Sequence, residues 1–94
     1  MKERSKRVEF RISAPQAENV HLCGSFNHWS ESADPMKKDS AGTWKKTKML
    51  SMGTHEYKFI VDGEWTLDPE CPDTTSNKFG TENNVIYPQI ALRH

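Results

Sequence analysis

The sequence predicts an all-β fold, an antiparallel β-sandwich. About six short segments alternate apolar and polar residues with the period of two that strands show. These segments recur at intervals of roughly 8–12 residues, with turn-forming residues between them. No segment carries an apolar stripe of helical period longer than about two turns. With 94 residues, the chain has room for one such domain.

The first three strands are expected at residues 8–12, 19–23 and 43–49. The first two alternate apolar and polar side chains, which is typical of a strand with one face in solvent. Pro15 closes the region of the first strand, and Gly24 follows the second. The third comes after residues 39–42, whose Asp, Ser, Ala and Gly favour a turn.

The strongest strand signal lies at residues 55–61, where the apolar side chains at positions 57, 59 and 61 share one face. Asp62-Gly63 follows at once, and this pair is preferred in the tight type I′ turn of a β-hairpin. Residues 64–67 are therefore expected to return antiparallel as the partner strand.

The rest of the chain is expected to hold a long loop and one more strand. Residues 70–84 are rich in turn formers, and a loop of this length in a compact domain is uncommon unless it carries function. The last strand is expected at residues 85–87. We expect residues 1–7, with four basic groups and one acid, to form a flexible basic arm, residues 8–88 the sandwich, and residues 89–94 a C-terminal tail.

The charges balance, with 13 basic and 13 acidic side chains and a formal net charge of zero. No overall field would then draw the protein to nucleic acid or to an anionic membrane. The lysines at positions 37, 38, 45, 46 and 48 are accompanied by a single aromatic residue, Trp44, and are interpreted as an exposed strand face. We therefore expect a neutral partner, with no nucleic acid and no membrane.

The sequence also favours a cytoplasmic protein. Its N-terminal residues lack the apolar stretch of a signal peptide, and no run approaches the roughly 18 apolar residues of a transmembrane helix. Two cysteines occur, Cys23 and Cys71, and reduced thiols are expected, although the sequence leaves a single disulfide open.

Signals for catalysis or metal binding are weak. A domain of this size leaves little room for a deep cleft. The four histidines, at positions 21, 28, 55 and 94, lack the spacing of zinc ligands. Ser25 lacks the flanking pattern of a nucleophile elbow. Asp68, Glu70 and Asp73 invite comparison with the paired acids of a glycosidase, but their surroundings favour a solvated loop. We expect no enzyme, no metal and no cofactor.

The aromatic residues are the remaining candidates for function. Trp29 lies in a loop-like stretch and Trp65 just past a hairpin turn, positions where an indole easily reaches solvent. A pyranose ring has an apolar face that stacks on indole, so sugars are a natural partner. Packing in the core is the alternative for both side chains, and it is the interpretation we adopt for Trp44.

Polar side chains are expected beside the two tryptophans. Lys58 lies on the strand face opposite Tyr57 and Phe59, which are assigned to the core, so it can share an outer surface with Trp65. Asn83 and Asn84 supply amides that both donate and accept hydrogen bonds.

Four ordered blocks of the sequence resemble a known family: GSFNHW at residues 24–29, GTHEYKFIVDGEW at 53–65, DP at 68–69 and GTENNVI at 80–86. With these blocks at this spacing, the chain is similar to the carbohydrate-binding modules of family 48. That family includes the glycogen-binding domain of the AMP-activated protein kinase β-subunit and the N-terminal modules of isoamylases and branching enzymes. The resemblance runs from residue 8 to residue 87.

The resemblance implies an immunoglobulin-like, early-set β-sandwich that binds α-1,4-linked glucans, such as glycogen, starch or maltooligosaccharides, without catalysis. Carried over by position, it also implies a set of carbohydrate-binding residues. Trp29 and Trp65 stack on sugar rings, Lys58 bonds to hydroxyls, Phe79 inserts against the glucan, and Thr81 and Asn83 contact the sugar. Many kinase-type members carry leucine where this chain has Phe79.

A second hypothesis comes from a different class of function. The sandwich would be a protein-interaction module that docks onto a glycogen-metabolism enzyme or a kinase complex, with a vestigial sugar site. It predicts that Trp29→Ala and Trp65→Ala leave partner binding intact. The sequence leaves the choice between glycogen and starch open.

Overall fold

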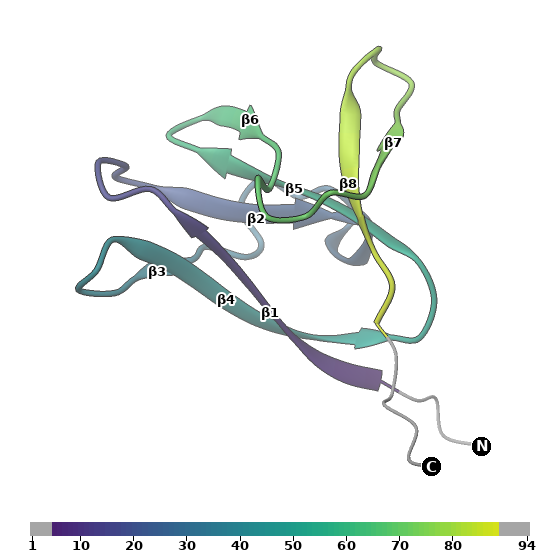
Figure 1. Cartoon of the computed structure of the whole chain (residues 1–94), viewed down its shortest axis with the longest axis horizontal. Coiled ribbons are helices and arrows are strands. Elements are labelled where there is room, and N and C mark those ends of the chain that lie inside the picture. Colours follow the sequence, from purple (N-terminus) through teal and green to yellow (C-terminus); the bar gives the residue numbers. More distant parts are fainter. Residues whose placement is uncertain (1–4, 89–94) are drawn as a thin grey trace.

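The computed structural model describes residues 5–88 and shows two antiparallel β-sheets around one core (Figure 1). The first sheet has the order β1-β4-β3, formed by β1 (Ser5–Ser13), β4 (Thr43–Ser51) and β3 (Lys37–Lys38). The second has the order β2-β5-β8-β7, formed by β2 (Val20–Gly24), β5 (His55–Val61), β8 (Glu82–Ile86) and β7 (Thr74–Ser76), and β6 (Glu64–Thr66) pairs with β5. A 3₁₀ turn, η1 (Ser25–Asn27), follows β2. The expected all-β, immunoglobulin-like sandwich is confirmed.

Strand β5 organises the second sheet because it has neighbours along both edges. One edge pairs with β2. The other edge is divided, since residues 55–57 pair with β8 and residues 59–61 pair with β6. The strands β6 and β8 therefore separate at Lys58. Because side chains alternate along a strand, Lys58 points to the face opposite Tyr57 and Phe59.

The core lies between the sheets and depends on aromatic rings. Phe59 is fully buried, and the ring centroid of Tyr57 lies 5.8 Å from that of Phe59 and 4.8 Å from that of Phe10. Trp44 is buried as well, and its indole N–H donates to the carbonyl of Ala14 at 2.9 Å. The assignment of Trp44, Tyr57 and Phe59 to the core is confirmed. These rings each bury a large area and supply much of the core.

The first strand begins earlier than the sequence predicts. β1 starts at Ser5 instead of residue 8, because residues 5–7 continue the unbroken register with residues 49–51 of β4. Residues 5–7, which were expected in the arm, are part of β1. Residues 1–4 and the expected tail at 89–94 lie outside the described residues.

The predicted long loop is also shorter than expected. Residues 70–84 contain β7 and the start of β8, which form an antiparallel hairpin. The polar residues of β7 lack an apolar alternation, and backbone pairing with β8 makes them a strand. The short β3 is held by β4 in the same way. Within residues 5–88, no helix has the length and apolar character needed to cross a membrane.

Candidate functional site

A groove of about 780 Å³ opens on the outer face of the second sheet, over the point where β6 and β8 separate. All six residues that the sequence analysis assigned to a binding site line it. The full lining is Ser25, Trp29, Glu56, Lys58, Trp65, Asn77, Lys78, Phe79, Thr81 and Asn83. These side chains come from three places: the loop after β2, strand β5 with its hairpin partner β6, and the β7–β8 hairpin.

Two indoles form the apolar side of the groove. The ring centroids of Trp29 and Trp65 lie 6.4 Å apart, and their planes are inclined by 52°. Trp65 is 47 % exposed, as predicted, whereas Trp29 is half-buried. The predicted tight turn places Trp65, since Asp62 and Gly63 both have positive φ, 49° and 86°, and bring it opposite Ile60 on β5.

The loop that carries Trp29 is strained and closely fitted. His28 and Trp29 each have φ of 57°, a left-handed conformation that costs a non-glycine residue roughly 1–3 kcal/mol. The backbone N–H of Trp29 donates to the carbonyl of Gly24 at 2.9 Å. Gly24 leaves no room for a side chain, because a Cβ there would lie 2.5 Å from the carbonyl oxygen of Glu56. The surrounding fold thus determines where the indole of Trp29 stands.

Asn77 holds the third part of the groove, the loop between β7 and β8. Its Oδ1 accepts the backbone N–H groups of Phe79 at 2.9 Å and Thr81 at 3.2 Å. Its Nδ2 donates to the Thr81 hydroxyl at 2.8 Å and to Asn83 Oδ1 at 2.9 Å. The half-buried amide of Asn77 therefore fixes the backbone under Phe79 and links it to two other residues of the groove.

Phe79 stands at the tip of this loop with its ring in solvent. It is 78 % exposed, the highest value among the large hydrophobic side chains of the described residues. The ammonium group of Lys78 lies 5.5 Å from the centroid of the phenyl ring. Because hydrogen bonds already hold the backbone of this loop, contact between the ring and a ligand would cost little conformational entropy.

Lys58 and Asn83 form the polar floor. Lys58 is 8 % exposed, and its Nζ donates to the Thr81 hydroxyl at 3.3 Å. The ammonium has three hydrogens, so donors remain for another acceptor. Asn83 Nδ2 donates to Glu56 Oε1 at 2.9 Å. These contacts orient both side chains before any ligand arrives.

Four lining residues were not among the predicted site residues: Ser25, Glu56, Asn77 and Lys78. Their contributions depend on the register of β5 and β8 and on the loop fold, which residue patterns do not give. Asn77, three residues before Gly80, carries a turn signal that points to its role. Asn84, which the sequence placed beside Asn83, is fully buried instead, and its amide bonds to Asp68 and Cys71.

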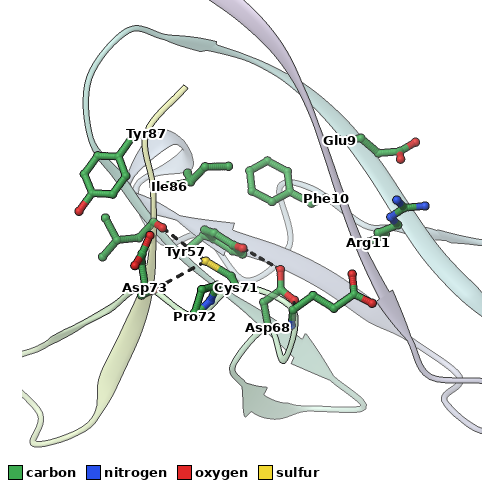
Figure 2. A pocket seen from close by; sticks show the side chains of 12 residues that line it. Glu9, Phe10, Arg11, Tyr57, Asp68, Cys71, Pro72, Asp73, Ile86 and Tyr87 are labelled. Atoms are coloured by element: carbon green, nitrogen blue, oxygen red, sulfur yellow. Dashed lines mark hydrogen bonds between the residues drawn. The ribbon is translucent and has the colours of Figure 1, made fainter. Parts of the chain in front are cut away.

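A second, smaller cavity of about 360 Å³ lies between β1 and the segment after β6 (Figure 2). Its lining includes Asp68, Glu70 and Asp73, the three acids that invited comparison with the paired acids of a glycosidase. Asp68 Oδ2 accepts the Tyr57 hydroxyl at 2.7 Å, and Asp68 Oδ1 accepts the Glu70 N–H at 2.9 Å. Burial and then this carboxylate raise the pKa of Tyr57 well above its ordinary value. Asp68 thus serves the fold, and Glu70 and Asp73 are exposed loop residues.

No histidine and no cysteine is among the described residues that line the groove. Among residues 5–88, no cluster of three or more His, Cys, Asp or Glu side chains is arranged to hold a metal ion. Both cysteines are free thiols. Burial, followed by the charge of Glu31, raises the pKa of Cys23 to about 11, so this thiol stays neutral at physiological pH.

The groove thus combines an exposed indole, a half-buried indole, a protruding phenyl ring and a hydrogen-bonded polar floor. The sequence matches, over residues 7–90, the family described as the glycogen recognition site of AMP-activated protein kinase. The chain belongs to this family and is a glucan-binding module.

Similar proteins come from animals and plants. The AMP-activated protein kinase subunit beta-1 of Sus scrofa is 46 % identical over 67 residues, which are 71 % of this chain and 52 % of that protein. The human subunit beta-1 is also 46 % identical over 67 residues, 23 % of its length. The chloroplastic protein PTST of Arabidopsis thaliana is 40 % identical over 95 residues, 92 % of this chain and 34 % of that protein. The chain spans about half or less of the length of these relatives.

Proposed function

We propose that the groove holds a segment of an α-1,4-linked glucan on Trp29 and Trp65, with Lys58, Phe79, Thr81 and Asn83 around it, and that the module performs no catalysis. The observation that carries this proposal is the convergence of these residues, from three separate parts of the chain, on one open groove. Membership in a glycogen-recognition family supports the class of ligand.

The inclination of the two indoles favours a curved ligand. Their planes differ by 52° across a separation of 6.4 Å, so one flat sugar ribbon cannot lie parallel to both. An α-1,4-linked chain winds into a helix, and its successive glucose rings are inclined to each other. A flat β-1,4-linked chain would meet only one indole face. The groove is therefore expected to select α-glucans.

The polar residues supply hydroxyl contacts at the edge of the stack. Lys58 Nζ, the Thr81 hydroxyl and the Asn83 amide each keep hydrogen-bonding capacity beyond the bonds that orient them. The site is shallow and wet, and binding also costs the freedom of the ligand, so we expect dissociation constants of roughly micromolar to millimolar.

The acidic residues of the groove do not suit glycoside hydrolysis. Among the lining residues Glu56 is the one carboxylate, and its Oε1 accepts a hydrogen bond from Asn83 at 2.9 Å. Hydrolysis requires two carboxylates on either side of the scissile bond, commonly about 5–9.5 Å apart. The groove therefore does not present the pair of acids that most glycosidases use.

The direct test is a titration of the protein with maltoheptaose or β-cyclodextrin, followed by tryptophan fluorescence. We expect saturable change in the micromolar to millimolar range, and much weaker change with cellohexaose, a β-1,4-linked control. Absence of any change at millimolar maltoheptaose would overturn the proposal.

A protein-docking role is a second candidate, favoured by the relatives named as kinase subunits and by the fraction of their length that this chain spans. The expected partner is a glycogen-metabolism enzyme or a kinase complex. Pull-down with Trp29→Ala and Trp65→Ala decides between the two functions, since docking alone predicts unchanged capture. The cytoplasmic location stays a prediction, because one similar protein is named as chloroplastic.

A further inference from the structure

We propose that Asp34, which lies outside the groove, is a positioning residue for glucan binding and acts on Trp29 through Asn27. The inference rests on the proposed function, because it concerns the same groove. Hydrogen bonds of the Asn27 side chain hold the loop between β2 and Trp29.

The side chain of Asn27 ties this loop to β2. Its Oδ1 accepts the Gly24 N–H at 3.0 Å. Its Nδ2 donates to the carbonyl of Leu22 at 3.0 Å and to Asp34 Oδ2 at 2.8 Å. An amide has two N–H donors, and both are used. The orientation of Asn27 is therefore fixed at one end by β2 and at the other by Asp34.

The backbone carbonyls of Gly24 and Asn27 hold the strained residues that follow. The carbonyl of Gly24 accepts the Trp29 N–H at 2.9 Å, and the carbonyl of Asn27 accepts the Ser30 N–H at 3.1 Å. Between them, His28 and Trp29 adopt a left-handed conformation that persists only where the surroundings enforce it. Loosening Asn27 releases both anchors of the turn, and the indole of Trp29 moves with it.

Asp34 is itself held from three directions. Its carbonyl accepts the Leu22 N–H at 2.9 Å, which places it beside β2. Lys48 Nζ lies 3.1 Å from its Oδ2, and Lys46 Nζ lies 3.8 Å from its Oδ1, both from β4 of the other sheet. Burial alone would raise the pKa of Asp34, but the hydrogen bonds from Asn27 and Lys48 and the two lysine charges outweigh it and lower the pKa. The carboxylate is thus anionic at neutral pH and accepts only.

The variant Asp34→Asn tests this role. It keeps the shape of the side chain but places an amide N–H group where Asn27 and Lys48 also donate. Asp39→Asn is the control, because the Asp39 carboxylate likewise accepts hydrogen bonds, in its case from two backbone N–H groups, and pairs with a lysine, Lys45, at 3.5 Å, without contact to the Trp29 loop. Asp34→Glu is the second variant, since it keeps the charge for the lysines and displaces the oxygen from Asn27.

Two readouts are needed, one of which does not depend on sugar. At a centroid distance of 6.4 Å we expect the excited states of the Trp29 and Trp65 indoles to couple and to give a paired circular-dichroism band. Loss of this band in Trp65→Phe would identify it. We expect Asp34→Asn to diminish this band at a temperature well below its melting transition. We also expect it to raise the maltoheptaose Kd about tenfold, or about 1.4 kcal/mol. Asp39→Asn is expected to leave both unchanged.

A folded Asp34→Asn protein with the paired band and the Kd of the wild type would overturn the inference, even if its melting temperature were lower. If Asp34→Asn does not fold, the same two measurements on Asp34→Glu decide. If wild-type protein fails to bind maltoheptaose, the proposed function falls, while the circular-dichroism band still reports whether Asp34 positions Trp29.

Discussion

The indole rings of Trp29 and Trp65 lie with their centroids 6.4 Å apart, although one belongs to the loop after β2 and the other to the β5–β6 hairpin. Strand β5 brings them together, because it pairs with β2 along one edge and with β6 along the other. Neither loop alone makes a platform for sugar. The proposed binding surface therefore depends on the pairing of β5 with both β2 and β6.

Trp65→Ala is expected to weaken maltoheptaose binding at least about tenfold, since a stacking surface that excludes water is lost. Folding stability should fall less than for a tryptophan of the core, because this indole is 47 % exposed. Isothermal titration calorimetry and urea unfolding measure the two quantities. The matched control is Tyr87→Ala, an aromatic side chain 52 % exposed that lines the other cavity. Equal loss of affinity in both variants would refute the placement of the site.

Phe79→Ala is expected to weaken binding by roughly twofold to tenfold, from the loss of about 0.5–1.5 kcal/mol of ring contact. Its 78 % exposure predicts a change in unfolding free energy within about 0.5 kcal/mol. Phe79→Leu should retain part of the affinity, since leucine keeps an apolar side chain at the loop tip. Met49→Ala, at an exposed site outside the groove, is the control. Unaltered affinity in Phe79→Ala would show that the loop tip does not touch the glucan.

Gly24→Ala is expected to destabilise the fold by about 1–3 kcal/mol, because the new methyl group overpacks a closed site. A Cβ at this position would lie 2.5 Å from the Glu56 carbonyl oxygen and 2.7 Å from the Phe26 ring. Urea unfolding measures the loss. Gly63→Ala separates crowding from backbone strain, since nothing lies within 4 Å of a Cβ there but its φ is 86°. A Gly24→Ala protein as stable as the wild type would contradict the close fit.

Acid unfolding should depend on Asp34. Its pKa in the folded state is lowered, so its stabilising contribution is complete above the unfolded pKa of about 3.9 and is lost as pH falls through the folded value. We expect Asp34→Asn to lower the free energy of unfolding by about 1–3 kcal/mol at pH 7. Below about pH 4 the difference in this free energy between the variant and the wild type should become smaller. Urea unfolding at pH 7, 4 and 3 measures both. A gap that stays constant over this range would contradict an ionised, hydrogen-bonded Asp34.

Much of the fold can be predicted from local patterns. The alternation at residues 55–61 and the Asp62-Gly63 turn both appear in the structure, because one face of β5 enters the core and the turn needs two positive φ values. The start of β1 and the strand β7 could not be predicted in the same way. Both consist of polar residues whose strand conformation comes from backbone pairing. For β1 the partner is the distant strand β4, and for β7 it is the next strand, β8.

The residues of the candidate site also differ in how far the sequence indicates them. Trp29 and Trp65 stand out because large apolar side chains in loops or beside turns waste surface unless they contact something. Phe79 is indicated only by the resemblance to the family. The supporting residue Glu56 does not stand out, because polar residues on strands are common, and the turn signal at Asn77 does not indicate which residues it bonds. Their roles follow from hydrogen bonds that exist only once β5, β7 and β8 are in register.

The most direct test is to follow the three indole N–H resonances in a ¹H–¹⁵N correlation spectrum during a titration with maltoheptaose. Trp29 and Trp65 line the groove, whereas Trp44 is buried with its indole N–H bonded to Ala14 and serves as an internal control. We predict that the Trp29 and Trp65 resonances shift together and saturate, while the Trp44 resonance stays in place. Unshifted Trp29 and Trp65 resonances at millimolar sugar, or a shift confined to Trp44, would contradict glucan binding in this groove.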